Sequence, residues 1–184
     1  DATEEVRALA AELAGFLQRV SGAKFSVVTN RPARGIFLGT QKQFPLPAFA
    51  DELAITNTFD GVEAFVVHPQ AGSLFLVGAT AQAVPHAAFT LLDRLGCRWF
   101  FPAPEWEVIP RQERIDVDFT IVDRPRILSR RIAWGFGFFD RRQGRCQADY
   151  EIWSRRNRMA QSFRTYTGHA WQAIVLENRE IFAA

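Results

Sequence analysis

Residues 73–102 read SLFLVGATAQAVPHAAFTLLDRLGCRWFFP and contain the most regular pattern in the chain. Residues 74–77 are apolar and end at a glycine, which predicts a short buried strand. A helix is predicted next, because apolar residues recur at the spacing that places them on one helix face. These residues are Val84, Ala87, Ala88, Leu91, Leu92 and Leu95. Thr80 is the predicted N-cap, Pro85 falls in the first turn, and Gly96 suits the left-handed residue after a helix. The stretch therefore predicts a strand and a helix that covers a sheet.

The flanking sequence predicts an α/β two-layer domain over residues 1–123. Residues 1–22 have the periodicity of an amphipathic helix, with Asp1 and Glu4 as a capping box and Gly22 as its stop. Five other segments have the composition or alternation of strands; they are residues 24–28, 35–39, 63–68, 105–109 and 114–119. Residues 63–68 and 74–77 are close enough for a hairpin, and 105–109 and 114–119 are joined by a predicted turn. We expect a mixed or antiparallel sheet with both helices on one face.

The composition fits a globular protein. Hydrophobic residues make up 48% and charged residues 23%, which excludes a disordered chain, and no apolar run approaches the ~20 residues that span a bilayer. The chain enters its first helix directly, so no signal peptide is expected within it, although one could have been removed upstream. Cys97 and Cys146 are expected to be free thiols, with a disulfide between them as the alternative.

Residues 95–100 read LGCRWF and follow Leu91, Leu92 and Asp93. This wording resembles the pattern FLE-x-LGCRWF-x-P in the domain that precedes the catalytic barrel of alpha-glucuronidases, beta-N-acetylhexosaminidases and a related group of uncharacterised bacterial carbohydrate-active proteins. The resemblance implies that residues 1–123 are such an accessory domain and that 124–184 are the incomplete start of a (β/α) barrel. It also implies a secreted or periplasmic protein that acts on polysaccharide, with uronate-containing polymers as candidates.

The same resemblance supplies the candidate substrate-binding residues. Residues 125–130 (PRILSR) match the start of the first barrel strand, where the arginine of hexosaminidases contacts the sugar, so Arg130 is the first candidate. Arg131 stands where those families have glycine. Residues 167–171 (TGHAW) resemble a turn after the second barrel strand, which makes His169 and Trp171 candidates for a sugar hydroxyl and its apolar face. A backbone-capping role for His169 is an equal alternative.

We expect no catalytic residue, cofactor or metal site in this chain, and no turnover by the chain alone. No nucleophilic triad, phosphate loop or zinc-binding spacing occurs, and no carboxylate pair is marked for glycoside hydrolysis. Glu105 and Glu107 alternate around Trp106 and are expected to be solvated on one strand face. The catalytic carboxylates of the implied enzyme are expected beyond residue 184.

Structural roles are expected for several other conspicuous residues. The aromatic run 134–139 is expected to be a barrel-core strand, and His68 and His86 are expected to be structural. Core positions are predicted for three consecutive aromatic residues, Trp99, Phe100 and Phe101.

Arginine is concentrated in the last third of the chain, where eleven arginines lie between residues 124 and 164 against three acids. Interleaved with aromatic residues, they suit nucleic acid, but no nucleic-acid-binding signature is present. Arginine also binds the carboxylates of acidic sugars in bidentate fashion. Carbohydrate and the remainder of the barrel are therefore the expected partners, and no membrane contact is expected. A basic binding module and a purely structural domain remain alternatives.

Overall fold

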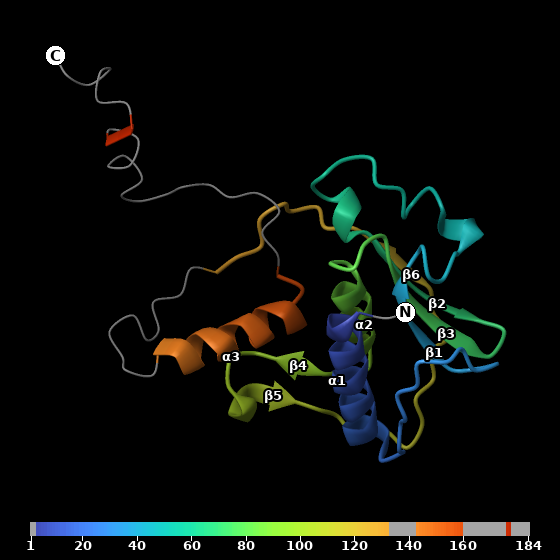
Figure 1. The fold of residues 1–184 in the computed structure, drawn as a ribbon. Coiled ribbons are helices and arrows are strands. Elements are labelled where there is room, and N and C mark those ends of the chain that lie inside the picture. Colours follow the sequence, from blue (N-terminus) through green and yellow to red (C-terminus); the bar gives the residue numbers. More distant parts are fainter. Residues whose placement is uncertain (1–2, 133–142, 160–175, 178–184) are drawn as a thin grey trace.

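A computed structural model describes residues 3–132, 143–159 and 176–177. It has two layers, a mixed sheet and two helices that cover one face of it, as predicted from the sequence (Figure 1). The helices are α1 (Glu4–Ser21), α2 (Val84–Arg94) and α3 (Gln143–Arg156). The strands are β1 (Ile36–Thr40), β2 (Phe65–Gln70), β3 (Ser73–Gly78), β4 (Arg98–Trp99), β5 (Glu107–Val108) and β6 (Ile121–Asp123). Short 3₁₀ turns lie at Pro47–Phe49, Gly61–Glu63 and Pro104–Trp106.

The main sheet has the strand order β1-β3-β2-β6. β1 is parallel to β3, whereas β2 is antiparallel to both β3 and β6. The predicted hairpin of β2 and β3 is confirmed, and its turn places Ala71 and Gly72 at φ of 51° and 74°. Two consecutive positive φ values are typical of the tight turn that matches strand twist. β1 is left as one edge of this sheet.

The α2 unit follows the sequence pattern closely, and all six residues of its predicted stripe are buried in the core. Gly96 has a φ of 93°, its N–H donates to the Asp93 carbonyl, and the next N–H, from Cys97, donates to the Leu92 carbonyl. This pair of bonds is the Schellman ending that glycine favours. The predicted N-cap is wrong, because the helix begins at Val84 and the Thr80 hydroxyl donates instead to the Val62 carbonyl at 2.6 Å.

The start of α1 also differs from the prediction. Its N-cap is Thr3, whose hydroxyl accepts from the Val6 N–H at 3.4 Å, so the predicted capping box of Asp1 and Glu4 is wrong. The predicted end is confirmed, because Gly22 is left-handed and its N–H donates to the Gln18 carbonyl. Thr3 thus provides the side-chain oxygen that accepts a backbone N–H at the start of the helix, two residues later than the predicted cap.

Apolar side chains cover both faces of the sheet. On one face, α1 and α2 contribute the larger cluster, which includes Leu13, Leu17, Leu76, Leu91 and Leu92. On the other face, the connection between β1 and β2 contributes a smaller cluster around Leu53, Val66 and Val77. The sheet is therefore buried on both sides without a second helix layer.

Two strand predictions are wrong, and a third is confirmed only in part. Residues 24–28 and 114–119 form no strand, and only Glu107–Val108 of 105–109 does so, paired with β4. Residues 110–119 instead run along the helix-side core, where Ile115, Val117 and Phe119 pack. Their alternating apolar side chains therefore pack on the core although their backbone pairs with no strand.

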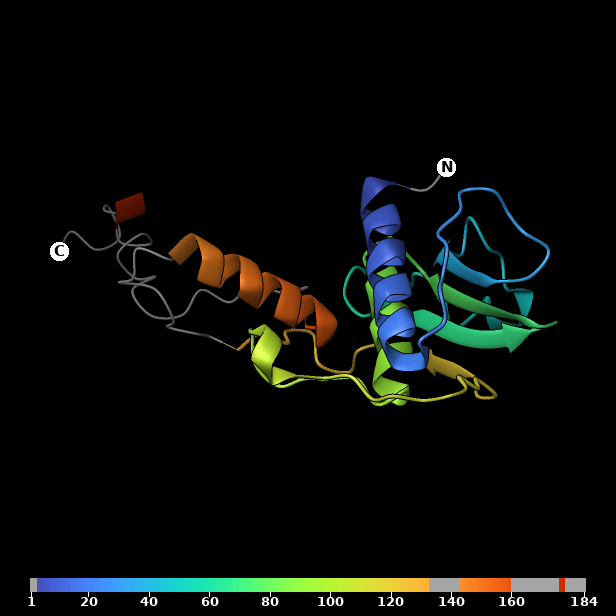
Figure 2. The same cartoon turned by 90° about the horizontal axis from the view of Figure 1, so that it is seen from below.

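The aromatic exit of α2 divides between core and surface. Trp99 is buried as predicted, but Phe100 and Phe101 are 63% and 39% exposed, so their predicted core positions are wrong. β4 ends at Trp99, and the chain then turns outward to the 3₁₀ turn before β5. Figure 2 shows that α3 approaches the helix layer with its C-terminal end and extends away from the sheet.

Candidate functional site

A buried carboxylate lies where the two regions of the chain meet. Glu63 ends a 3₁₀ turn ahead of β2, and its side chain is completely buried. The same Oε2 atom is 2.8 Å from Nε2 of His86, in the first turn of α2, and accepts a hydrogen bond from Arg130. A buried carboxylate is costly unless charged and hydrogen-bonding partners surround it. Glu63 thus ties Arg130 to the α/β layer.

Arg130 uses all three guanidinium nitrogens within the protein. Nε donates to the Arg158 carbonyl at 3.0 Å, and Nη1 donates to the Ile127 carbonyl at 2.7 Å. Arg158 in turn donates to the Thr90 hydroxyl on α2 at 3.0 Å. One network therefore joins residues that precede β2, residues of α2 and residues on both sides of positions 133–142.

The end of α3 makes a second set of contacts with the domain. Arg156 pairs with Glu12 of α1 and Glu107 of β5, and its guanidinium lies over the rings of Phe16 and Trp99 at 5.0 and 5.8 Å. Trp153 and Asn157 donate to the Trp99 carbonyl at 2.9 and 3.1 Å. Trp99 belongs to the LGCRWF motif, so this motif forms part of the surface that receives α3.

The structure places one of the three predicted substrate-binding residues. Arg130 is in the network above, and its contact with a sugar stays a prediction. His169 and Trp171, like the aromatic run 134–139, lie outside the described residues.

The other ionisable residues singled out from the sequence have contacts within the fold. His68 Nδ1 is 2.9 Å from the Thr120 hydroxyl, as expected for a structural histidine. Glu105 lies in a 3₁₀ turn and Glu107 in β5, so the prediction that the two share a strand face is wrong. Glu107 is not a solvated carboxylate, because it pairs with Arg19 and Arg156.

Burial controls the chemistry of the motif cysteine. Cys97 is a free thiol without exposed surface, and desolvation raises its pKa to about 11. The thiolate is the nucleophilic form of cysteine, so Cys97 is inert near neutral pH. The side chain of Cys146 lies outside the described residues, so the predicted thiol state of that residue stays a prediction.

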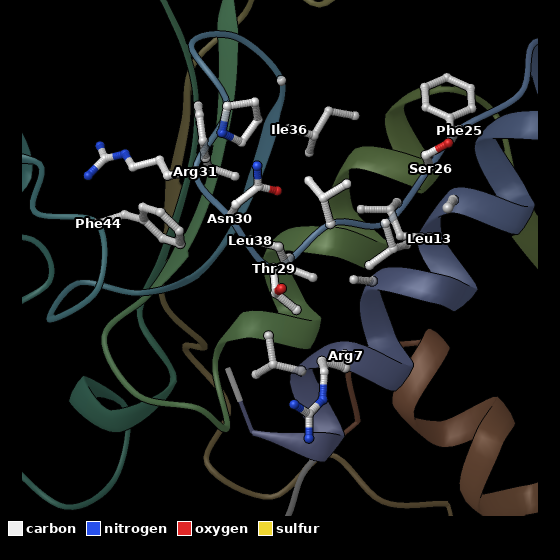
Figure 3. Close-up of a pocket in the computed structure, with 18 of the residues that line it drawn as sticks. Arg7, Leu13, Phe25, Ser26, Thr29, Asn30, Arg31, Ile36, Leu38 and Phe44 are labelled. Carbon is white, nitrogen blue, oxygen red and sulfur yellow. The ribbon is translucent and has the colours of Figure 1, made fainter. Parts of the chain in front are cut away.

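A cleft of about 640 Å³ lies between α1 and β1 (Figure 3). Val6, Leu13 and Leu17 of α1 form one wall, and residues 25–38 form the other. Arg7, Arg31 and Arg34 line it, and no acidic residue does. The charged side chains that line the cleft are therefore all basic, and they lie among apolar and uncharged polar residues.

Sequence reasoning missed Glu63, Arg156 and this cleft. An acid directly before the apolar run 64–67 is a signal for Glu63, because its position next to a buried strand requires a partner. Arg156 has no such signal, since its partners lie far away in the sequence.

Comparison with known proteins assigns the chain to no group: no family model matches it, and neither does any curated protein. In the described residues, no cluster of histidine, cysteine, aspartate and glutamate is suited to hold a metal ion. No helix in that part of the chain has the length and apolar character needed to cross a bilayer.

Proposed function

We propose that residues 1–123 are the non-catalytic accessory domain of a carbohydrate-active protein and that their task is to hold the segment that follows them. The observation that carries this proposal is the pairing of Arg130 with the buried Glu63. A buried ionic contact of this kind fixes orientation, because breaking it leaves an uncompensated charge. The contacts of Arg156 and Trp153 with α1, β4 and β5 act in the same direction.

Carbohydrate as the substrate class rests on the LGCRWF motif and on the surface beside it. Phe101 and Trp106 are exposed neighbours, with ring centroids 6.0 Å apart. Phe101 also lines a small pocket with Asp149 and Arg156. Exposed aromatic faces next to hydrogen-bonding groups suit pyranose rings, which have apolar faces and polar edges. On this proposal the parent protein acts outside the cytoplasm, and the chain alone does not hydrolyse glycosides.

Hydrogen exchange tests the holding function. In Glu63→Gln the charge that pairs with Arg130 is removed while the shape is kept, so amides in residues 124–132 are expected to exchange faster than in the unmodified chain. The matched control is Arg126→Gln, an exposed arginine in the same segment, which should leave exchange unchanged. Equal exchange in both variants would show that the buried pair does not hold this segment.

Affinity electrophoresis tests the substrate class. The full chain is run through gels that contain a neutral polysaccharide, a uronate-containing polysaccharide or DNA. Retardation by a polysaccharide that is reduced in Trp106→Ala supports carbohydrate. Retardation by DNA alone, abolished by salt, would favour the basic binding module instead. Hydrolysis of aryl glycosides or uronate oligosaccharides by the purified chain would contradict the non-catalytic assignment.

A further inference from the structure

The cleft between α1 and β1 is bordered by an open strand edge. The Gly35 carbonyl accepts from the Leu74 N–H of β3 at 3.0 Å, and the Gln41 N–H donates to the Gly78 carbonyl at 2.9 Å. Backbone groups alternate in direction along a strand, so Ile36 and Leu38 point theirs away from β3. The outward N–H of Thr40 is already used by Gln43 Oε1 at 2.9 Å. The open edge is therefore short and centred on Ile36 and Leu38.

The segment before β1, which belongs to the same wall of the cleft, also has spare backbone groups. Within the described part of the chain, residues 24–34 form no backbone hydrogen bond, although 24–28 have the composition of a strand. Val27 and Val28 of this wall are 47% and 55% exposed. Unpaired backbone groups and apolar side chains thus line a space of about 640 Å³. These are the features that accept an added strand, with main-chain bonds for affinity and alternate side-chain pockets for specificity.

The charge of the lining restricts what that strand is. Three arginines and no acidic residue line the cleft. Among the described residues, none of these arginines forms an ion pair. Arg31 instead rests over the rings of Phe37 and Phe44 at 5.5 and 5.4 Å, which leaves its guanidinium edge available (Figure 3). A second copy of this chain is a poor occupant, because edge-to-edge pairing of two β1 strands would bring two sets of these arginines together.

We propose that this cleft is a docking site for an extended acidic peptide segment of a partner protein, which adds to β1 as a further strand. Carboxylates of the partner pair with Arg7, Arg31 and Arg34, and its apolar side chains contact the α1 wall at Leu13. The partner main chain hydrogen-bonds to Ile36 and Leu38. This inference is independent of the proposed accessory function, because the residues that line the cleft differ from those of the Arg130 network.

Fluorescence anisotropy with the full chain tests the proposal. The probe is a labelled peptide Glu-Val-Glu-Val-Glu, compared with Lys-Val-Lys-Val-Lys and with Glu-Val-Glu-Pro-Glu, which keeps the charge but lacks one N–H. We expect saturable binding of the first peptide, weakened by salt, and binding at least about tenfold weaker for the other two. The double variant Arg31→Gln and Arg34→Gln is expected to weaken binding about tenfold, as two rim ion pairs would. Arg94→Gln, an exposed arginine outside the cleft, should leave binding unchanged.

Several outcomes would overturn the proposal. Absence of saturable binding, or equal binding of the acidic and basic peptides, would exclude an acidic occupant. Equal binding of the proline peptide would indicate adhesion by charge alone. Slow hydrogen exchange of residues 24–28 in the free chain would show that the chain's own segment occupies the β1 edge. A concentration-dependent dimer that loses peptide binding would indicate a second copy.

Discussion

Arginine is used in opposite ways at the Glu63 network and at the β1 cleft. At the Glu63 network, Arg130 and Arg158 are half-buried and donate hydrogen bonds to protein acceptors. At the β1 cleft, Arg31 and Arg34 are exposed and line a space without acids. Because the cost of an unpaired charge depends on burial, the first pair of arginines serves stability and the second is free for binding. Residue type alone does not separate these roles, whereas the surroundings do.

The largest effect on stability is expected at the Glu63 network. Arg130→Met removes the guanidinium that pairs with the buried Glu63, so the free energy of unfolding should fall by about 3 kcal/mol. Urea denaturation of the full chain measures this value. A loss below about 0.5 kcal/mol is typical of ordinary surface substitutions. It would show that arginine contributes no more to stability at the Glu63 network than at the β1 cleft.

Cys97 provides a pH test of the enclosed core. Burial raises the pKa of this thiol from 9.0 to about 11, so the native state holds its proton where the unfolded chain has lost it. The contribution of the buried thiol to the free energy of unfolding is complete below pH 9. It falls by roughly 2–3 kcal/mol as the pH rises toward 11. Comparison with Cys97→Ala isolates it from other titrating groups. If the free energy of unfolding changed with pH in the same way in both proteins, the raised pKa of Cys97 would be contradicted.

Adjacent arginines on α3 should differ in proportion to their burial. Arg156 is 20% exposed at its side chain and has two carboxylate partners, whereas Arg155 is 42% exposed and pairs with Glu12. Arg156→Leu is expected to lower the opening free energy of α3 by about 1–2 kcal/mol, and Arg155→Leu by less than about 1 kcal/mol. Hydrogen exchange of the α3 amides gives both values. The reverse order would show that burial does not control these contacts.

The smallest effect is expected at the cleft. Arg34→Gln should change the unfolding free energy by no more than about 0.5 kcal/mol, since this exposed side chain has no ionic partner among the described residues. Arg31→Gln should change it by no more than about 1 kcal/mol, because it loses only the contacts with the Phe37 and Phe44 rings. Thermal melts with matched urea curves check this. A loss above about 1 kcal/mol in either variant would mean that these arginines stabilise the fold.

The sequence predicts the parts of this structure that depend on neighbouring residues. The stripe on α2 and the glycine endings of α1 and α2 follow from spacing and from φ preferences, which are local properties. Residues 24–28 and 114–119 show the limit of this reasoning. Their composition favours extended backbone, but whether a ladder forms depends on a distant edge.

Site prediction meets the same limit. Arg130 was singled out through a resemblance, and its spatial neighbour Glu63 lies 67 positions earlier in the chain. No periodicity connects two such residues. The cleft likewise combines α1 with residues 25–38, which fold back beside it, so its charge becomes visible only after folding.

The central claim is that Glu63 and Arg130 act as a coupled pair that joins the α/β layer to the segment after it. A double-mutant cycle with Glu63→Gln and Arg130→Met, followed by urea denaturation, measures this coupling directly. The account predicts that the double variant is more stable than the sum of the single losses implies, by at least about 1.5 kcal/mol. Losses that add to within about 0.5 kcal/mol would show two independent residues and would contradict it.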